Sequence, residues 1–132
     1  MKAAASYRQH QVFSAPNEVV LVLLLQKVLE KLESAQAAMN VGGAEARLQW
    51  CQDLGRVRAI VAELRNALDH EVAPELAGGL SSTYTWILGR ITEVGRTGNA
   101  ADVDGLLRAT RPLYEAFSTA LADVEPSDES AG

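Results

Sequence analysis

The spacing of apolar residues constrains the fold more than any other feature of this chain. In four segments, apolar side chains recur at alternating steps of three and four, which places them on one face of an α-helix. The segments span about residues 16–40, 44–69, 80–96 and 100–122. We find no strand pattern of any length. The spacing therefore predicts an all-α protein, and four helices of about 20 residues with short links predict an antiparallel, up-down four-helix bundle.

Glycine and proline residues mark the links between these segments. Gly42-Gly43 ends the first helix, and the second link contains Pro74 and Gly78-Gly79. Thr97-Gly98-Asn99 breaks the chain before the fourth helix, where Asn99 is suited to cap the new helix. The residues predicted to form the core are Leu21, Leu24, Leu25, Val28, Leu32, Ala35 and Met39 in the first helix; Trp50, Leu54, Val57, Val61, Leu64 and Leu68 in the second; Leu80, Tyr84, Ile87, Leu88, Ile91 and Val94 in the third; and Val103, Leu106, Leu107, Leu113, Tyr114, Phe117 and Leu121 in the fourth.

The two ends of the chain depart from this pattern. We expect residues 1–124 to form one domain, in which residues 1–14 are an N-terminal arm or a short helix. Residues 125–132 are polar and acidic, and we expect them to be disordered. Inside the fourth segment, Pro112 lacks the amide hydrogen that a helix uses, and its ring clashes with the preceding turn. The fourth helix is therefore expected to bend between Arg108 and Pro112 or to split there.

The first helix contains more apolar residues than one buried face needs. Seven occur in a row from Val19 to Leu25, so the helix begins apolar on every side. Two interpretations are open: this end is enclosed by the other helices and the arm, or some of its residues line a groove for a partner helix. Trp86 raises the same question, because it lies off the core side of the third helix and tryptophan is common in interfaces.

Composition argues against several functions. The chain carries 12 basic and 17 acidic side chains, a net charge of −5, and its basic residues do not cluster as nucleic-acid binding requires. Its seven-residue apolar run is well short of the roughly 20 residues that span a membrane. The first residues lack the continuous apolar stretch of a secretory signal, so we expect a cytoplasmic protein. Cys51 is the single cysteine, which excludes an intrachain disulfide.

The sequence contains no recognisable set of catalytic or metal-binding residues. His10 and His70 are not spaced as metal ligands, and Cys51 is most simply a lone thiol on the second helix. Glu30 and Glu33 fit a solvated helix face, because no Glu-x-x-His partner accompanies them. We therefore expect no enzymatic activity, no cofactor and no metal.

Several short motifs, taken in order, resemble those of the FliS-type flagellar export chaperones. SYRQHQV resembles the Tyr-x-x-x-x-Val opening of that family, and APNEVVLVLLL resembles the start of its first helix. LRNALD resembles the end of its second helix, LSSTYTWILGRITEVG its third helix and DVDGLLRATRPLYEAF its last helix. The likeness covers about residues 6–122. The chain departs from the family pattern at Ala15, Leu24-Leu25-Gln26, Gly95 and Pro112, which indicates a divergent member.

The resemblance implies a chaperone that binds the disordered C-terminal segment of flagellin in the cytoplasm. Such a protein prevents premature polymerisation and assists delivery to the flagellar type III export apparatus, whose export gate is a further expected partner. The resemblance also implies that the arm packs near the groove, so Tyr7→Ala should weaken flagellin binding while the bundle stays folded. The residues expected at the flagellin groove are Tyr7, Val12, Leu21, Leu24, Leu25, Tyr84, Trp86, Arg90 and Tyr114.

Two further functions are open at this point. One is a helical adaptor or regulator for another secretion substrate, which differs from the chaperone in its partner. The other is a structural bundle that self-associates through its first helix. A homodimer without cargo would have twice the mass of the 14.1 kDa chain in light scattering.

Overall fold

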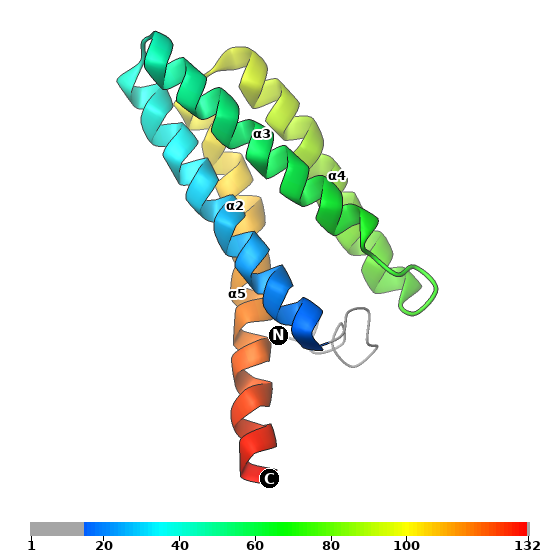
Figure 1. Cartoon of the computed structure of the whole chain (residues 1–132). Coiled ribbons are helices and arrows are strands. Elements are labelled where there is room, and N and C mark those ends of the chain that lie inside the picture. Colours follow the sequence, from blue (N-terminus) through cyan, green and yellow to red (C-terminus); the bar gives the residue numbers. More distant parts are fainter. Residues whose placement is uncertain (1–14, 132) are drawn as a thin grey trace.

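The computed structural model describes the backbone of residues 15–131 and the side chains of residues 18–122. Within that part, the chain forms four helices: α2 (Ala15–Val41), α3 (Ala44–Asn66), α4 (Pro74–Thr97) and α5 (Ala100–Ala131) (Figure 1). The described residues contain no strand. The arm expected at residues 1–14 lies outside the described residues, and so do Tyr7 and Val12.

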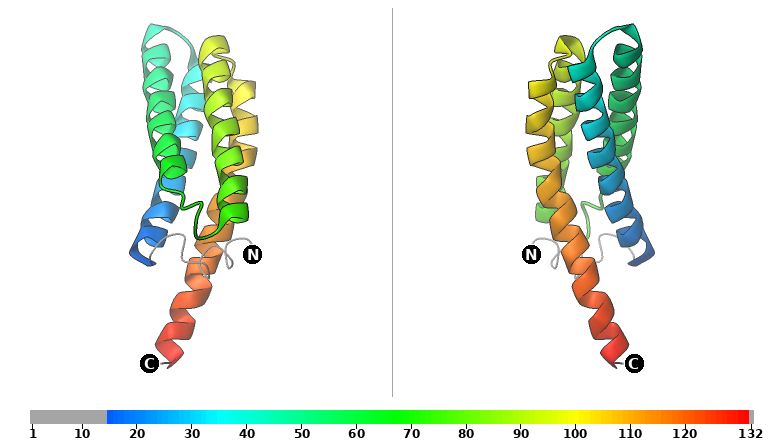
Figure 2. Two further views of the ribbon diagram at one scale, coloured as in Figure 1. Left: turned by 90° about the vertical axis from the view of Figure 1, so that its right-hand side faces the viewer. Right: turned by 90° about the vertical axis from the view of Figure 1, so that its left-hand side faces the viewer.

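The four helices run alternately up and down and pack side by side along most of their length (Figure 2). α2 packs against α3 on one side and against α5 on the other, and α4 closes the ring by contacting α3 and α5. The contact between α4 and α5 is the least extensive of the four. The predicted all-α, antiparallel four-helix bundle is confirmed.

A single apolar core lies between the helices. Every helix contributes residues spaced three and four apart, as the sequence pattern predicts. The largest fully buried side chains are those of Tyr84, Leu25, Leu32, Ile87, Ile91 and Leu106. Burying one such side chain stabilises the fold by about 1.5–3 kcal/mol. Leu24, Met39, Leu88, Leu113 and Tyr114, also predicted to belong to the core, are partly buried and pack against it.

Two boundaries differ from the sequence-based prediction. α4 begins at Pro74 rather than near residue 80, because proline suits the first turn of a helix. Gly78 and Gly79 then remain helical, since Ala77 and Leu80 on either side of them are buried in the core. The expected disorder of residues 125–132 is also not found as far as Ala131, because α5 continues to that residue as helix. Each residue added to an existing helix brings one backbone hydrogen bond without a new nucleation step.

α5 does not split at Pro112. The helix is continuous from Ala100 to Ala131. Proline removes the hydrogen bond that would reach the carbonyl of Arg108, but Pro112 and Arg108 are both exposed, so water can solvate that carbonyl. One turn away, the hydroxyl of Thr110 donates a 2.8 Å hydrogen bond to the carbonyl of Leu106. A hydroxyl bond of this kind often accompanies a bend in a helix.

The turns use backbone conformations that favour glycine. Gly42 and Gly43 have φ angles of 78° and 95°, which allow the tight reversal from α2 into α3. Gly98 has a φ of 64°, and its amide donates a 2.8 Å hydrogen bond to the carbonyl of Val94 to close the end of α4. The side chain of Asn99 then accepts a 3.0 Å hydrogen bond from the amide of Ala101, which confirms its predicted capping role.

Candidate functional site

The apolar start of α2 is partly open to solvent. Leu21 and Leu25 are 2% and 1% exposed, so they belong to the core. Val19, Val20 and Leu23 are 39%, 50% and 57% exposed. We call these three exposed residues the α2 patch. The apolar start of α2 is therefore divided between a face that completes the core and a face that points outward.

The α2 patch ends abruptly along the helix. The next outward-facing residues are Gln26, Lys27 and Glu30, all exposed and polar. In addition, Lys27 and Glu30 form an ion pair of 3.3 Å. The outer face of α2 therefore changes from apolar to charged within one turn. A polar outer face is what a helix of this kind needs for solubility, so the apolar first turns are the exception that requires an explanation.

The register between α2 and α5 locates the α2 patch in the bundle. Arg111 of α5 pairs with Glu33 of α2 at 2.9 Å, and Gln36 of α2 donates a 2.8 Å hydrogen bond to Asp104 of α5. Leu23 precedes Glu33 by about 15 Å along the helix axis. The α2 patch thus lies at the end of the bundle where α5 continues beyond the other helices (Figure 1).

Trp86 provides a second exposed apolar side chain. It is 50% exposed, whereas its neighbour Ile87 is 1% exposed and lies in the core. The indole ring reaches α5 at Gly105: a Cβ atom placed on Gly105 would lie 4.0 Å from the ring. Trp86 therefore lies across the seam between α4 and α5, where these helices make their least extensive contact. Its side chain is a surface group of the bundle rather than a core residue.

Tyr84 is a core residue. It is 1% exposed, and its hydroxyl has no hydrogen-bond partner among the described residues. Burial also raises the pKa of the Tyr84 phenol above its usual value near 10, because the phenolate cannot be solvated there. A buried neutral side chain of this kind supports the bundle and does not face a ligand.

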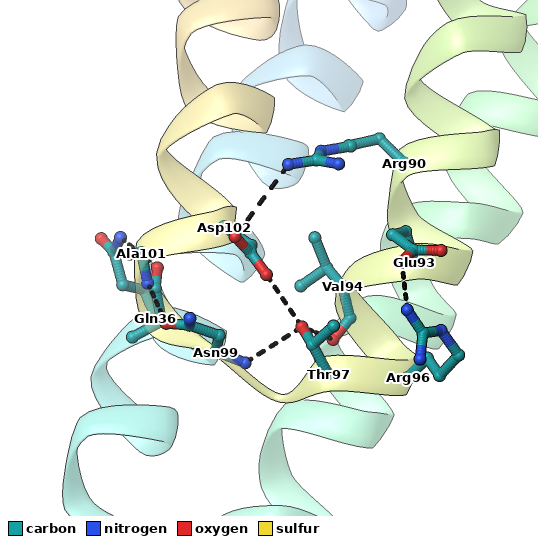
Figure 3. A network of polar contacts seen from close by, with 10 residues as sticks. Gln36, Arg90, Glu93, Val94, Arg96, Thr97, Asn99, Ala101 and Asp102 are labelled. Atoms are coloured by element: carbon teal, nitrogen blue, oxygen red, sulfur yellow. Dashed lines mark hydrogen bonds and ion pairs between the residues drawn. The ribbon is translucent and has the colours of Figure 1, made fainter.

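Arg90 belongs to a polar network where α4 meets α5 (Figure 3). Its guanidinium lies 4.0 Å from the carboxylate of Asp102. The same carboxylate accepts a 2.9 Å hydrogen bond from the hydroxyl of Thr97. Nearby, Glu93 and Arg96 pair within α4, and this contact lowers the pKa of the Glu93 carboxyl. The network fixes the turn between the two helices and occupies Arg90.

Of the residues expected at a flagellin groove, those that the structure describes do not lie together on one exposed surface. Leu21, Leu25 and Tyr84 are buried in the core, while Leu24 and Tyr114 are partly buried against it. The structure brings Trp86 to the surface, with Arg90 on the same seam. The α2 patch was absent from that set, although its position opposite the buried stripe of α2 is readable from the helical period.

The described residues show no sign of a metal site or a membrane span. No group of three or more His, Cys, Asp or Glu side chains is arranged to hold a metal ion in the part of the chain that the structure describes. Within the same part, no helix combines the length and the apolar character needed to cross a bilayer.

Four antiparallel helices around one apolar core, with some large apolar side chains left exposed, define the class of small helical bundles. Comparison with known proteins identifies the family. A family model described as "Flagellar protein FliS" matches residues 1–124, and the chain belongs to the FliS family. It is 32% identical over 125 residues to the "Flagellar secretion chaperone FliSB" of Pseudomonas aeruginosa, an alignment that covers 89% of this chain and 97% of that protein.

Proposed function

We propose that this protein is a cytoplasmic flagellar export chaperone that binds the disordered C-terminal segment of flagellin. In this role it prevents premature polymerisation and assists delivery of flagellin to the flagellar type III export apparatus, where the export gate is a further partner. Membership of the FliS family supports the proposal, and so does the likeness to a flagellar secretion chaperone along nearly the whole chain.

The observation that carries the proposal is the apolar surface at the start of α2. Val20 and Leu23 are at least half exposed, and the residues that follow them on the outer face of α2, Gln26, Lys27 and Glu30, are polar. An unfolded flagellin terminus presents amphipathic stretches that need apolar surface to fold against. Such coupled folding costs several kcal/mol of ordering, so it requires a broad and mainly apolar contact. A helix laid along the α2 patch would bury these side chains.

We assign the flagellin surface to the α2 patch and to Trp86, together with the partly buried Leu24 and Tyr114. Leu21, Leu25 and Tyr84 act through the core by holding the shape of that surface. Tyr7 and Val12 remain proposed contacts of the arm. In this proposal the arm lies near the surface and affects cargo binding.

The test is titration calorimetry of the protein with the C-terminal segment of flagellin from the same cell, with circular dichroism recorded alongside. One-to-one binding with a gain in helical content is expected, because the segment folds on the bundle. An N-terminal flagellin segment of equal length is the matched control and should bind more weakly. Absence of binding by an intact bundle would reject the flagellin assignment and favour an adaptor for another secretion substrate.

Self-association is the second candidate that the α2 patch favours. A second copy of the chain could cover Val20 and Leu23 in the absence of cargo. Light scattering distinguishes the two: a mass near twice 14.1 kDa that persists after flagellin is added would support a structural homodimer. A dimer that dissociates when the flagellin segment binds agrees with the chaperone proposal.

A further inference from the structure

A separate groove lies between α3 and α4. It contains a pocket of about 230 Å³ whose floor is formed by the buried side chains of Leu54 and Ile91. Gly55 of α3 and Gly95 of α4 line its walls, so no side chain from these positions fills it. A Cβ atom added to Gly55 would have nothing within 4 Å. The groove is therefore an apolar depression large enough for one aliphatic side chain.

Three arginines, Arg47, Arg58 and Arg65, lie on the same face of α3 by the helical period, and Arg58 lines the pocket. Arg58 donates a 2.9 Å hydrogen bond to the hydroxyl of Thr92, and Arg65 donates one of 3.4 Å to the hydroxyl of Thr85. The guanidinium of Arg47 lies 5.7 Å from the centre of the Trp50 ring. Arg47 and Arg65 are separated by 18 positions, so the row is about 27 Å long.

Among the described residues, these three arginines form no ion pair within 4.0 Å. The partners of Arg47, Arg58 and Arg65 are two hydroxyls and an aromatic ring. The chain as a whole has a net charge of −5. A row of unpaired arginines is therefore a local positive strip on an acidic protein, beside an apolar pocket.

The groove is distinct from the proposed flagellin surface. Thr85 and Thr92 face α3, whereas Trp86 reaches the opposite flank of α4 and lies against α5. The α2 patch lies on a helix that does not contribute to the groove. Occupation of the two surfaces by different segments is therefore sterically compatible.

We propose that the α3–α4 groove is a second docking site, which takes an acidic amphipathic helix of a partner protein. A large aliphatic side chain of that helix fills the pocket, and carboxylates on its flanks pair with the arginine row. Helix-in-groove recognition supplies apolar anchors of this kind, and arginine forms bidentate bonds with carboxylates. An acidic peptide is favoured over nucleic acid because the chain is acidic and the pocket between the arginines is apolar.

The experiment uses two synthetic 18-residue helical peptides with the same leucine stripe. One carries glutamate on both flanks of the stripe and the other carries lysine. Fluorescence anisotropy at about 50 mM salt, where screening is weak, should show binding of the glutamate peptide alone. Cys51 is exposed and lines the pocket, so bound peptide should also slow its alkylation by iodoacetamide. Equal binding of both peptides, or no binding of either, overturns the proposal.

Variants of the protein locate the binding. Arg58→Ala combined with Arg65→Ala should weaken the glutamate peptide about tenfold or more. Gly55→Leu should weaken it similarly by filling the pocket. Arg56→Ala removes the same charge about 200° around α3 from Arg58 and is the matched control, with no expected effect. If Arg56→Ala weakens the peptide as much as the groove variants do, the binding is non-specific and the proposal fails.

Two further outcomes keep this proposal separate from the chaperone function. The groove variants should bind the C-terminal flagellin segment with the same affinity as the unchanged protein. This expectation also holds if the unchanged protein binds that segment weakly. The acidic C-terminal residues of a second copy are a competing occupant of the groove. If truncation after residue 122 strengthens peptide binding and abolishes self-association, those residues occupy the groove, and the assignment to a partner protein is wrong.

Discussion

The hydroxyl of Ser34 on α2 donates a 2.7 Å hydrogen bond to the carboxylate of Asp53 on α3, which is only 2% exposed. The same carboxylate accepts a 3.1 Å hydrogen bond from Gln49 and lies 3.9 Å from the ammonium group of Lys31. A buried carboxylate is tolerated only when donors and a counter-charge surround it. Asp53 therefore ties α2 to α3 at a single register.

Ser34→Ala should lower the free energy of unfolding by about 1.5–3 kcal/mol, because it removes a donor from a buried charge. Urea denaturation followed by circular dichroism measures the change. Lys27→Ala is the control, since it removes only the exposed pair with Glu30 and should cost less than about 0.5 kcal/mol. Equal effects of the two substitutions would contradict the structural role of Asp53.

Gly98→Ala should also destabilise the bundle. Gly98 has a left-handed φ of 64°, and an added Cβ would lie 3.1 Å from the ring of Trp50. The backbone conformation and the crowding together should cost about 1–3 kcal/mol in urea denaturation. Gly55→Ala is the matched comparison, because its Cβ meets nothing within 4 Å. That change should stabilise α3 by about 1 kcal/mol, and a loss of stability there would argue against the described packing.

Tyr84→Phe should stabilise the protein by about 1 kcal/mol. The substitution keeps the buried ring and removes a hydroxyl that lacks a hydrogen-bond partner among the described residues. Thermal and urea denaturation at neutral pH measure the effect. A marked loss of stability would show that the hydroxyl has a partner and would contradict the prediction.

Alkaline pH provides an independent test of the same side chain. The folded pKa of Tyr84 is raised by burial above the unfolded value near 10, so the folded state keeps its proton while the unfolded state loses it. Unfolding then releases a proton above pH 10, and stability falls as the pH rises towards the folded pKa, by about 1.4 kcal/mol per pH unit. Tyr84→Phe should remove this part of the alkaline loss, and identical pH profiles would refute the assignment.

Pro112→Ala should raise the stability of the bundle. Pro112 lies inside the continuous helix α5 and is exposed, so alanine restores one backbone hydrogen bond without filling or emptying the core. Proline in a helix interior costs up to about 3 kcal/mol relative to alanine, and the gain should be a sizeable part of this. Differential scanning calorimetry checks the prediction. An unchanged or lower melting temperature would mean that the proline geometry is needed for packing against α2 or α4.

The sequence predicts the core well and some of its boundaries poorly, for physical reasons. The burial of Val28 and Leu32 is predicted correctly because residues on the buried face of a helix recur with the helical period in the sequence. Intrinsic propensities predict a link at Gly78 and Gly79 and a bend or split at Pro112. At the two glycines, burial of Ala77 and Leu80 outweighs a local cost of about 1 kcal/mol for each glycine. At Pro112 the helix continues because the exposed surface lets water solvate the carbonyl that loses its hydrogen bond.

The candidate surface is harder to predict than the core. The helical period predicts Leu21 and Leu25 as core residues, whereas the family resemblance also implies that they line the groove, and they are buried. The packing of α3 and α5 on either side of α2 decides how much of Val20 and Leu23 stays exposed. The position of Trp86 beside Gly105 likewise depends on how α4 and α5 meet.

The α2 patch leads to the prediction that tests the proposed function most directly. Leu23→Gln should weaken binding of the C-terminal flagellin segment about tenfold or more, because burying a leucine contributes about 1.5–3 kcal/mol. Trp86→Ala should act in the same direction. Both side chains are at least half exposed, so the free energy of unfolding should change little.

Leu48→Gln is the matched control: Leu48 is 62% exposed near the start of α3, at the other end of the bundle. If Leu48→Gln weakens binding as much as Leu23→Gln does, the contact is not confined to the α2 patch and the assignment of the flagellin surface is wrong.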